Sequence, residues 1–364
     1  MTSSSYAFNT ATATFDSGSL TSWTVGSGST LTEQGTATIA LGTLTVQSGG
    51  TLTHTANTTT RANVIDISAT TIDIQSGGSV TAVGLGYSVG SGTGAGVALS
   101  GAGGGYGGNG GDNAASTGGT TYGSVTAPID LGSGAGTTSN GTSTKGGGAI
   151  KLSASGTLTV NGTVSSNGGT GCNGNPGGCG SGGSVWLAAN TFTGNGTVTS
   201  SSASNAGNGG GGGGGRVALY YTTDSSTWTV QAFGGTVAGA GTRGGAGTIY
   251  RKAAAATNGD LIIDNNSLTS AANTTQLAAT NETYDNLTVK NSAKYVIPNT
   301  SSLTFATALT GSATNRGSIT VNNGATLNVP TAAFTFNQVD VNHSGAVGVS
   351  GVTNLTDLTL TSSS

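Results

Sequence analysis

Residues 182–198 read Gly-Gly-Ser-Val-Trp-Leu-Ala-Ala-Asn-Thr-Phe-Thr-Gly-Asn-Gly-Thr-Val. A glycine run leads into a short apolar stretch, a polar break follows, and a second apolar stretch begins. This phrase occurs four times, and the last glycine before each copy is Gly148, Gly183, Gly215 or Gly247. The spacings of 35, 32 and 32 residues indicate stacked structural units rather than an ordinary globular domain.

The composition favours β structure throughout. Of the 364 residues, 68 are glycine but only 4 are proline, which excludes collagen, because collagen needs abundant proline. The hydrophobic residues, 34% of the chain, come in short bursts rich in Val, Ile and Thr. Such residues suit strands, whereas glycine and threonine weaken helices, so we expect an all-β protein.

The charge pattern excludes two classes of partner. Charged residues make up 6% of the chain, and the net charge is −3. Because no basic stripe is present, we expect no nucleic-acid binding through phosphate contacts. A helix that spans a membrane needs about 18 or more consecutive apolar residues, and no such run occurs, so we expect no membrane insertion.

Three zones can be distinguished along the chain. In residues 1–83, a unit of alternating apolar and polar residues around Gly-Gly begins at Leu44 and returns at Ile72. Residues 84–251 keep this rhythm and add glycine-rich insertions, whereas residues 252–364 have the short strands without glycine runs. We expect all three zones to form coils of one architecture.

These features predict a parallel β-helix, which we expect to be right-handed, with glycine-rich insertions on one face. Each coil would pair its strands with those of the coils above and below, and inward Val, Ile and Leu would stack in columns. An antiparallel β-sandwich array is the alternative. It would use hairpin turns at Asn-Gly pairs such as Asn161-Gly162 and Asn195-Gly196.

The glycine-rich insertions allow two interpretations. They could be flexible loops, or extended glycine chains that pack side by side, because no Cβ keeps their backbones apart. Their recurrence at one point of the repeat favours the ordered arrangement on a single face. Tyr106 and Tyr122 lie inside the largest insertion, where we expect little core, so we predict that they form an exposed contact surface.

The two cysteines, Cys172 and Cys179, flank a turn-rich segment within one insertion. We expect them to form a disulfide, which would place the chain in an oxidising compartment, although free thiols remain the alternative. A zinc site needs about four ligands, and the chain has only two histidines, so we predict no metal and no other cofactor.

The unit Gly182-Gly-Ser-Val-Trp-Leu-Ala-Ala, with its Gly-Asn-Gly-Thr-Val continuation and the later Arg-Val-Ala-Leu-Tyr-Tyr, resembles glycine-rich repeats of large bacterial cell-surface and adhesin-like β-helical proteins. The resemblance covers about residues 140–270. It implies an extracellular structural or adhesive role and carries no catalytic residues. In composition alone, the insertions are also similar to the glycine-rich tips of some phage adhesins.

We therefore expect a non-enzymatic extracellular rod, a segment of a surface fibre or self-assembling filament. Its partners would be further copies of itself, flanking parts of a longer chain, or a surface glycan or receptor bound by the glycine-rich face. A polysaccharide-degrading β-helix enzyme is the lesser alternative, because the acidic residues are scattered and form no catalytic pair. Residues 1–6 lack the features of a signal peptide, so we expect the chain to be a fragment of a longer secreted protein. The alternative is a protein that never uses the secretory route, such as a phage fibre.

Overall fold

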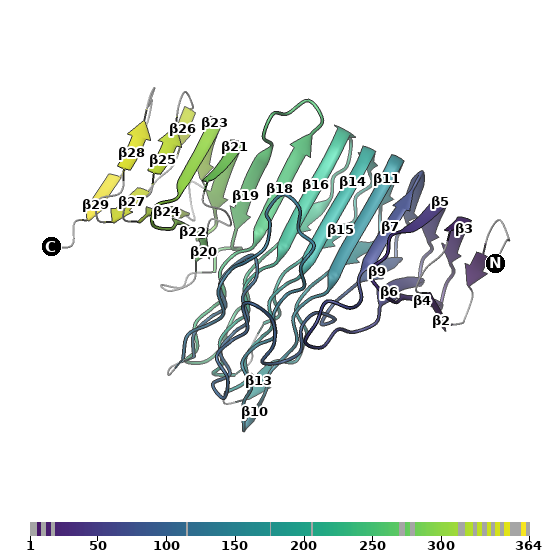
Figure 1. Ribbon diagram of the computed structural model, residues 1–364, viewed down its shortest axis with the longest axis horizontal. Helices are drawn as coiled ribbons and strands as arrows, with labels where there is room; N and C mark the ends of the chain where they lie inside the picture. The colour runs from purple at the N-terminus through teal and green to yellow at the C-terminus, as the bar shows by residue number, and fades with distance from the viewer. Residues whose placement is uncertain are drawn as a thin grey trace.

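The computed structural model describes residues 6–8, 12–15, 19–113, 116–174, 176–204, 207–268, 274–276, 281–311, 317–322, 326–329, 333–335, 339–342, 346–349 and 358–361. Within these ranges the protein is all-β, as predicted, and its sheets are mostly parallel (Figure 1). The same ranges contain no helix that is long and apolar enough to cross a membrane.

The largest sheet runs the length of the described chain. Its strands, in pairing order, are β1 (Tyr6–Phe8), β3 (Ser19–Val25), β5 (Ile39–Val46), β7 (Ile65–Ala69), β11 (Ala149–Val160), β14 (Ser184–Thr193), β16 (Arg216–Asp224), β18 (Thr248–Ala253), β19 (Asp260–Asp264), β21 (Asn281–Lys290), β23 (Ser302–Gly311), β25 (Thr326–Val329) and β28 (Ala346–Val349), with β8 (Thr71–Ile74) beside β5 and β11, and β26 (Ala333–Thr335) beside β23.

Two further parallel sheets accompany the first. One is formed by β17 (Thr229–Gln231), β15 (Thr197–Thr199), β12 (Thr163–Ser165), β9 (Ser79–Thr81), β6 (Thr51–His54), β4 (Thr30–Glu33) and β2 (Thr12–Phe15). The other is formed by β20 (Thr275–Gln276), β22 (Lys294–Ile297), β24 (Ser318–Val321), β27 (Val339–Asn342) and β29 (Leu358–Thr361). A small antiparallel pair, β10 (Gly141–Thr142) with β13 (Asn173–Gly174), completes the set.

The four copies of the repeat lie side by side in register. In β11, β14, β16 and β18 the residues that directly follow the last glycine are paired: Ala149 with Ser184, Ser184 with Arg216, and Arg216 with Thr248. In the first three copies a later strand pairs in the other sheet, where Val198 of β15 lies between the corresponding valines of β12 and β17. The parallel pairing predicted from the repeat is confirmed.

Apolar side chains form columns inside this stack. Ile150, Val185, Val217 and Ile249 occupy equivalent positions on neighbouring strands, and all four are buried in one hydrophobic cluster. Alternation along each strand sends every second side chain inward, so one column adds apolar contact at each repeat. Stability is therefore distributed along the stack rather than concentrated in one centre.

The antiparallel alternative required hairpin turns at two Asn-Gly pairs, and neither pair forms a hairpin. Asn161-Gly162 separates β11 from β12, and Asn195-Gly196 separates β14 from β15. In each case the two flanking strands lie in different sheets and pair with parallel neighbours from other repeats. These Asn-Gly pairs therefore turn a corner between sheets instead of closing a hairpin.

Among the described strands of the large sheet, the pairing changes from parallel to antiparallel at one place, next to the expected zone boundary at residue 252. Strands β18 and β19 pair antiparallel, with Tyr250 opposite Leu261. Gly259, in the hairpin connection, has a φ of 82°, a left-handed conformation that favours glycine. Apart from a small cluster around Leu131, most buried apolar side chains of the described residues form two clusters, one reaching from Trp23 to Ile249 and the other from Val125 to Leu327.

Two ionisable side chains are buried near the N-terminal end of the core. Glu33 of β4 and His54 of β6 are paired residues on neighbouring strands, and both are almost inaccessible to solvent. Burial raises the pKa of Glu33 to about 8. The hydrogen bond from the Asp66 backbone lowers this pKa, and the nearby Asp66 charge raises it. Burial lowers the pKa of His54 to about 4. Both side chains are therefore uncharged near pH 7.

The raised pKa of Glu33 predicts that the protein loses stability at mildly alkaline pH. Because its pKa is raised in the folded state, its contribution is present at low pH and is lost as the pH rises towards 8. The contribution of His54 to the pH dependence of stability lies below its ordinary pKa of 6.5. Of the two buried groups, only Glu33 therefore contributes to that dependence above this pH. Where only the folded state holds this proton, stability changes by about 1.4 kcal/mol per pH unit, so the unfolding free energy should fall by about 2 kcal/mol between pH 6.5 and 8.

Denaturant titrations at these two pH values measure the difference directly. In Glu33→Gln the group cannot ionise, so its unfolding free energy should be nearly the same at both. An equal decline in the wild type and in this variant would contradict the assignment.

Candidate functional site: a layer of packed glycine chains

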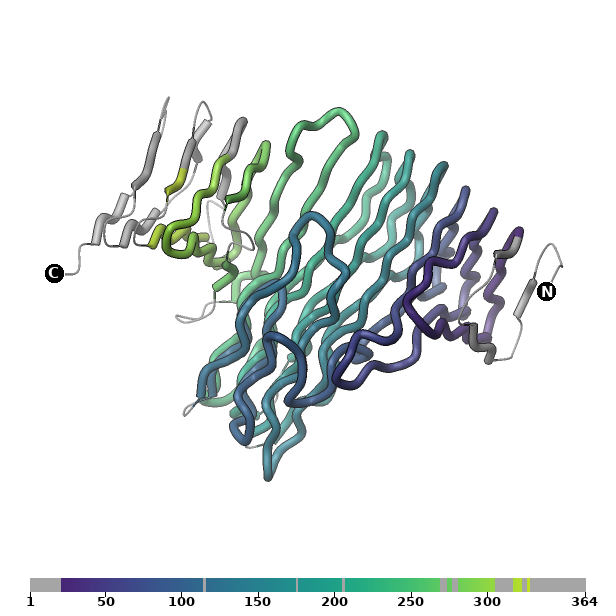
Figure 2. Tube along the Cα trace, viewed as in Figure 1, coloured from purple at the N-terminus to yellow at the C-terminus, as the bar shows by residue number. Residues whose placement is uncertain are grey.

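Four long segments leave the stack at one fixed point of the repeat. Residues 82–148, 166–183, 200–215 and 232–247 connect the ends of β9, β12, β15 and β17 to the starts of β11, β14, β16 and β18. Figure 2 shows them side by side, projecting away from the strands on one side of the molecule. We call these four segments the glycine layer.

Backbone hydrogen bonds join each segment to the next. Gly147 N donates to Ser181 O at 2.9 Å, Gly182 N to Gly213 O at 3.0 Å, and Gly214 N to Gly245 O at 2.9 Å. These bonds connect the first segment to the second, the second to the third and the third to the fourth. The side-by-side arrangement favoured by the repeat is therefore what the described residues adopt.

The direction of these hydrogen bonds rotates along the chain with a period of three residues. In the third segment, Gly210 and Gly213 donate to Gly101 and Gly104, while Gly211 and Gly214 donate to Thr242 and Gly245. A chain with three residues per turn, as in the polyproline II conformation, directs successive amides to different sides. Each glycine chain can therefore bond to neighbours all around it, whereas a β-strand bonds to two.

The first segment uses this property to build a second tier. Its stretch 101–111 lies over the others, with Gly104 N donating to Cys179 O and Gly108 N to Gly214 O, both at 2.9 Å. Asn109 N reaches Thr274 O, beyond the fourth segment. One long insertion thus covers the three shorter ones and ties them together.

Side chains have no room between these chains. A Cβ at Gly213 would lie 1.9 Å from Gly108 O, and one at Gly244 would lie 1.8 Å from Gly212 O. Real Cβ atoms do not approach backbone oxygens so closely, and in both cases the obstacle is backbone that cannot rotate away. Glycine is therefore a steric requirement at these positions.

This packing predicts a sharp difference between two glycine substitutions. Gly213→Ala forces the two tiers apart, whereas the Cβ of Gly169→Ala would lie 3.2 Å from its nearest neighbour, Lys145 O. Since overpacking costs about 1–3 kcal/mol, we expect Gly213→Ala to lower the unfolding free energy by that amount or more. Gly169→Ala, the matched control, should change it by less than about 1 kcal/mol. Guanidinium denaturation followed by circular dichroism would measure both, and equal effects would contradict the close packing.

The end of the layer farthest from the strands is held by a disulfide. Cys172 and Cys179 are joined, with their Cα atoms 5.2 Å apart, and both are buried. The pairing of β13, within this loop, with β10 of the first segment fastens it to its neighbour. Cys172 Sγ also contacts Ser204 O of the third segment at 3.4 Å.

Tyr106 and Tyr122 do not form the exposed contact surface that we predicted. Tyr106 is 0% exposed and Tyr122 is partly buried, with their rings 4.8 Å apart. The first segment returns to the base of the layer, so both rings pack where it meets β14 and β16. There the Tyr106 hydroxyl lies 2.6 Å from Ser184 Oγ, and the Tyr122 hydroxyl donates to Leu131 O at 2.5 Å. Burial raises the pKa of both phenols.

A buried arginine completes this junction. Arg216, the first residue of β16, is fully buried and donates from Nε and Nη2 to Tyr122 O, at 3.0 and 2.8 Å. Its Nη1 donates to Thr248 Oγ1 at 3.2 Å, and its guanidinium lies 5.4 Å from the Tyr106 ring centroid. Arg216 directly follows a glycine run, and its guanidinium thus satisfies the Tyr122 carbonyl of the first segment.

Residues 122–131 of the first segment cross the outer surface of the large sheet, and we call them the strap. Figure 2 shows this stretch arching over the strands. Arg61 Nε donates to Ile129 O at 2.8 Å, Ser184 Oγ to Asp130 O at 2.6 Å, and the Tyr220 hydroxyl to Thr126 O at 2.6 Å. The strap therefore connects the glycine layer to several successive strands.

Exposed apolar groups are found at the far end of the layer. Val97 and Leu99 are 46% and 79% exposed, and Leu99 has a φ of 59°, which is strained for a leucine. Beside them is a hollow of about 590 Å³. It is lined by Val97, Asp112, Asn113, Ser116, Thr117, Ala240 and Thr242. Apart from Asp112, this surface consists of uncharged side chains.

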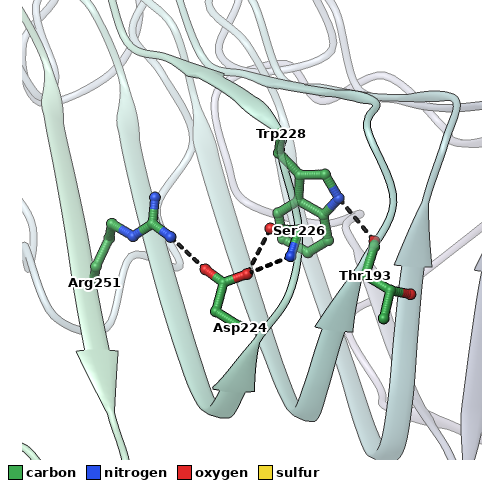
Figure 3. Close-up of polar contacts among 5 residues, drawn as sticks. All are labelled: Thr193, Asp224, Ser226, Trp228 and Arg251. Atoms are coloured by element: carbon green, nitrogen blue, oxygen red, sulfur yellow. Dashed lines mark hydrogen bonds and ion pairs between the residues drawn. The ribbon is translucent and has the colours of Figure 1, made fainter.

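Several carboxylates of the stack hold turns. Figure 3 shows Asp224, at the end of β16, between Arg251 and Ser226. Its Oδ1 accepts hydrogen bonds from Ser226 N and Oγ at 2.9 and 2.6 Å, and nearby Trp228 Nε1 donates to Thr193 O at 2.9 Å. Asp285 likewise accepts bonds from the backbone of the β18–β19 hairpin. These contacts stabilise connections between neighbouring repeats.

In the part of the chain that the structure describes, no three or more His, Cys, Asp or Glu side chains form a cluster that could hold a metal ion. Comparison with protein-family models, with curated proteins and with solved structures gives no match for this chain. The interpretation of function therefore depends on the geometry of the molecule.

Proposed function

We propose that this chain is a non-enzymatic structural and adhesive segment of an extracellular surface fibre. Its stack would be a parallel β-helix, and the glycine layer would be a rigid plate that holds the far end of the insertions away from the rod. The parallel pairing of successive repeats supports the first point. Hydrogen bonding between all four segments supports the second.

One observation carries the adhesive role: the far end of the layer is rigidly supported and yet exposes Leu99 in a strained conformation. An exposed leucine with positive φ reduces stability without improving the core, and such strain is typical of contact sites. Apart from Asp112, the hydroxyl and amide surface around it is uncharged, which suits an uncharged glycan or a neutral receptor patch. The Cys172–Cys179 disulfide agrees with an oxidising, extracellular setting.

Substitution of the exposed leucine tests this role. Leu99→Gly removes the side chain and also relieves the left-handed strain, so we expect unchanged or higher stability together with about a tenfold or greater loss of affinity. Thermal unfolding measures the stability, and glycan arrays and whole-cell binding measure the affinity. The matched control is Ile129→Ser, which alters an exposed apolar side chain of the strap, 45% accessible, and should leave binding intact. Equal binding by both variants would contradict the proposal.

Self-assembly is the second candidate function. Within the described residues, β1 and β28 each have one hydrogen-bonded neighbour in the large sheet. An open parallel edge can accept a further strand, either from another copy or from a flanking part of a longer chain. Electron microscopy at increasing protein concentration should then show end-to-end filaments, whereas particles of constant length would argue against association through these edges.

A further inference from the structure

An aspartate and a lysine face each other beneath the strap. Asp66 of β7 and Lys151 of β11 are paired residues on neighbouring parallel strands, and Lys151 Nζ lies 3.4 Å from Asp66 Oδ2. Pro128 and Ile129 of the strap help to enclose a cavity of about 220 Å³ that both residues line. The Asp66 side chain is only 14% exposed, and Lys151 Nζ lies 5.4 Å from the ring centroid of Trp186.

A second carboxyl group adjoins this pair from inside the core. Glu33 Oε1 accepts a hydrogen bond from Asp66 N at 3.2 Å, and Glu33 is 1% exposed. Its other oxygen, Oε2, is buried without a hydrogen-bond partner, and so is Asp66 Oδ1. Glu33 is the one acidic residue among the buried side chains of the described chain. Since the pKa of Glu33 is raised to about 8, it carries a transferable proton at neutral pH.

A matched pair elsewhere lacks these features. Asp264 of β19 and Lys290 of β21 are also paired residues, also 3.4 Å apart, and the aspartate is again 14% exposed. However, Asp264 Oδ1 accepts hydrogen bonds from Asn266 N and Asn291 Nδ2, both at 2.9 Å. Its carboxylate is satisfied as an ion, whereas one oxygen of Asp66 has no partner.

We propose that Lys151 and Asp66 condense to form an intramolecular amide bond, with Glu33 as the proton-transfer group. The bond would cross-link β7 to β11, residues that are 85 positions apart in the sequence. It would enclose the whole first segment of the glycine layer, residues 82–148, in a covalent loop. This inference is independent of the proposed adhesive function.

The reaction is a dehydration that needs no other reagent. A proton passes from the Lys151 ammonium to the Asp66 carboxylate, which leaves a neutral amine beside a neutral acid. The amine attacks Asp66 Cγ, and Glu33 gives its proton to Asp66 Oδ1 while it takes one from Nζ. Counted from the ion pair, two N–H bonds and one C–O bond break, one C–N and two O–H bonds form, and water leaves with Glu33 restored. The 3.4 Å contact between Lys151 Nζ and Asp66 Oδ2 places the amine beside the carboxyl group that it attacks.

Intact-mass spectrometry of the folded, purified protein tests the proposal. With its disulfide reduced, the wild type should be lighter than the sequence mass by one water molecule. Peptide mapping should locate a branched peptide that joins residues 66 and 151. Lys151→Arg keeps the positive charge but offers no amine, so it should have the full mass. The matched control, Lys290→Arg, should still lose one water.

Glu33→Gln keeps the shape of the side chain but has no acidic proton, so its cross-linking should be much slower or absent. Cross-linking at the wild-type rate in this variant would overturn the role of Glu33. A wild-type protein that keeps its full mass after prolonged incubation would overturn the proposal itself. So would a loss of water that persists in Lys151→Arg.

Discussion

The close contact between glycine backbones is the constraint on which the rest of the molecule depends. Hydrogen-bonded strands in a sheet lie about 4.8 Å apart, so chains that leave successive strands begin at about that spacing. A layer continued at this spacing has no room for a Cβ, as the 1.8 Å approach to Gly212 O at Gly244 illustrates. The register of the stack and the glycine content of the insertions are thus two consequences of one geometry.

This arrangement solves a problem of hydrogen bonding as well as one of space. Glycine loses much conformational entropy when it is ordered, so an ordered glycine chain needs compensation. Here the three-residue period lets successive amides reach different neighbours, and the first segment covers the other three. The buried Arg216 and the tyrosines at the base then hold this layer against the strands.

Much of the stack could be predicted from the sequence because its signals are local and repeated. The spacing of Gly148, Gly183 and Gly215 already contained the register of β11, β14 and β16. The proximity of Cys172 and Cys179 in sequence likewise made their disulfide geometrically simple.

No comparable signal in the sequence predicts the path of the first segment of the glycine layer. Tyr106 was expected to be exposed because its neighbours are glycines, yet it lies beside Ser184, 78 positions away. Contacts of this kind depend on the path that the chain takes within residues 84–148, and neither the composition nor the period of the repeat specifies that path. The environment of Glu33 was equally hidden, since its burial follows from the positions of β4 and β7 rather than from its own neighbours. Contacts that occur only once in the structure produce no repeating sequence pattern from which they could be predicted.

Hydrogen–deuterium exchange of the native protein tests the central account most directly. If the glycine layer is held by backbone hydrogen bonds on all sides, the amides of residues 207–215 should exchange about as slowly as those of β14. Exchange of these amides at the rate of an unstructured chain, with β14 still protected, would show that the insertions are flexible loops and would contradict the account.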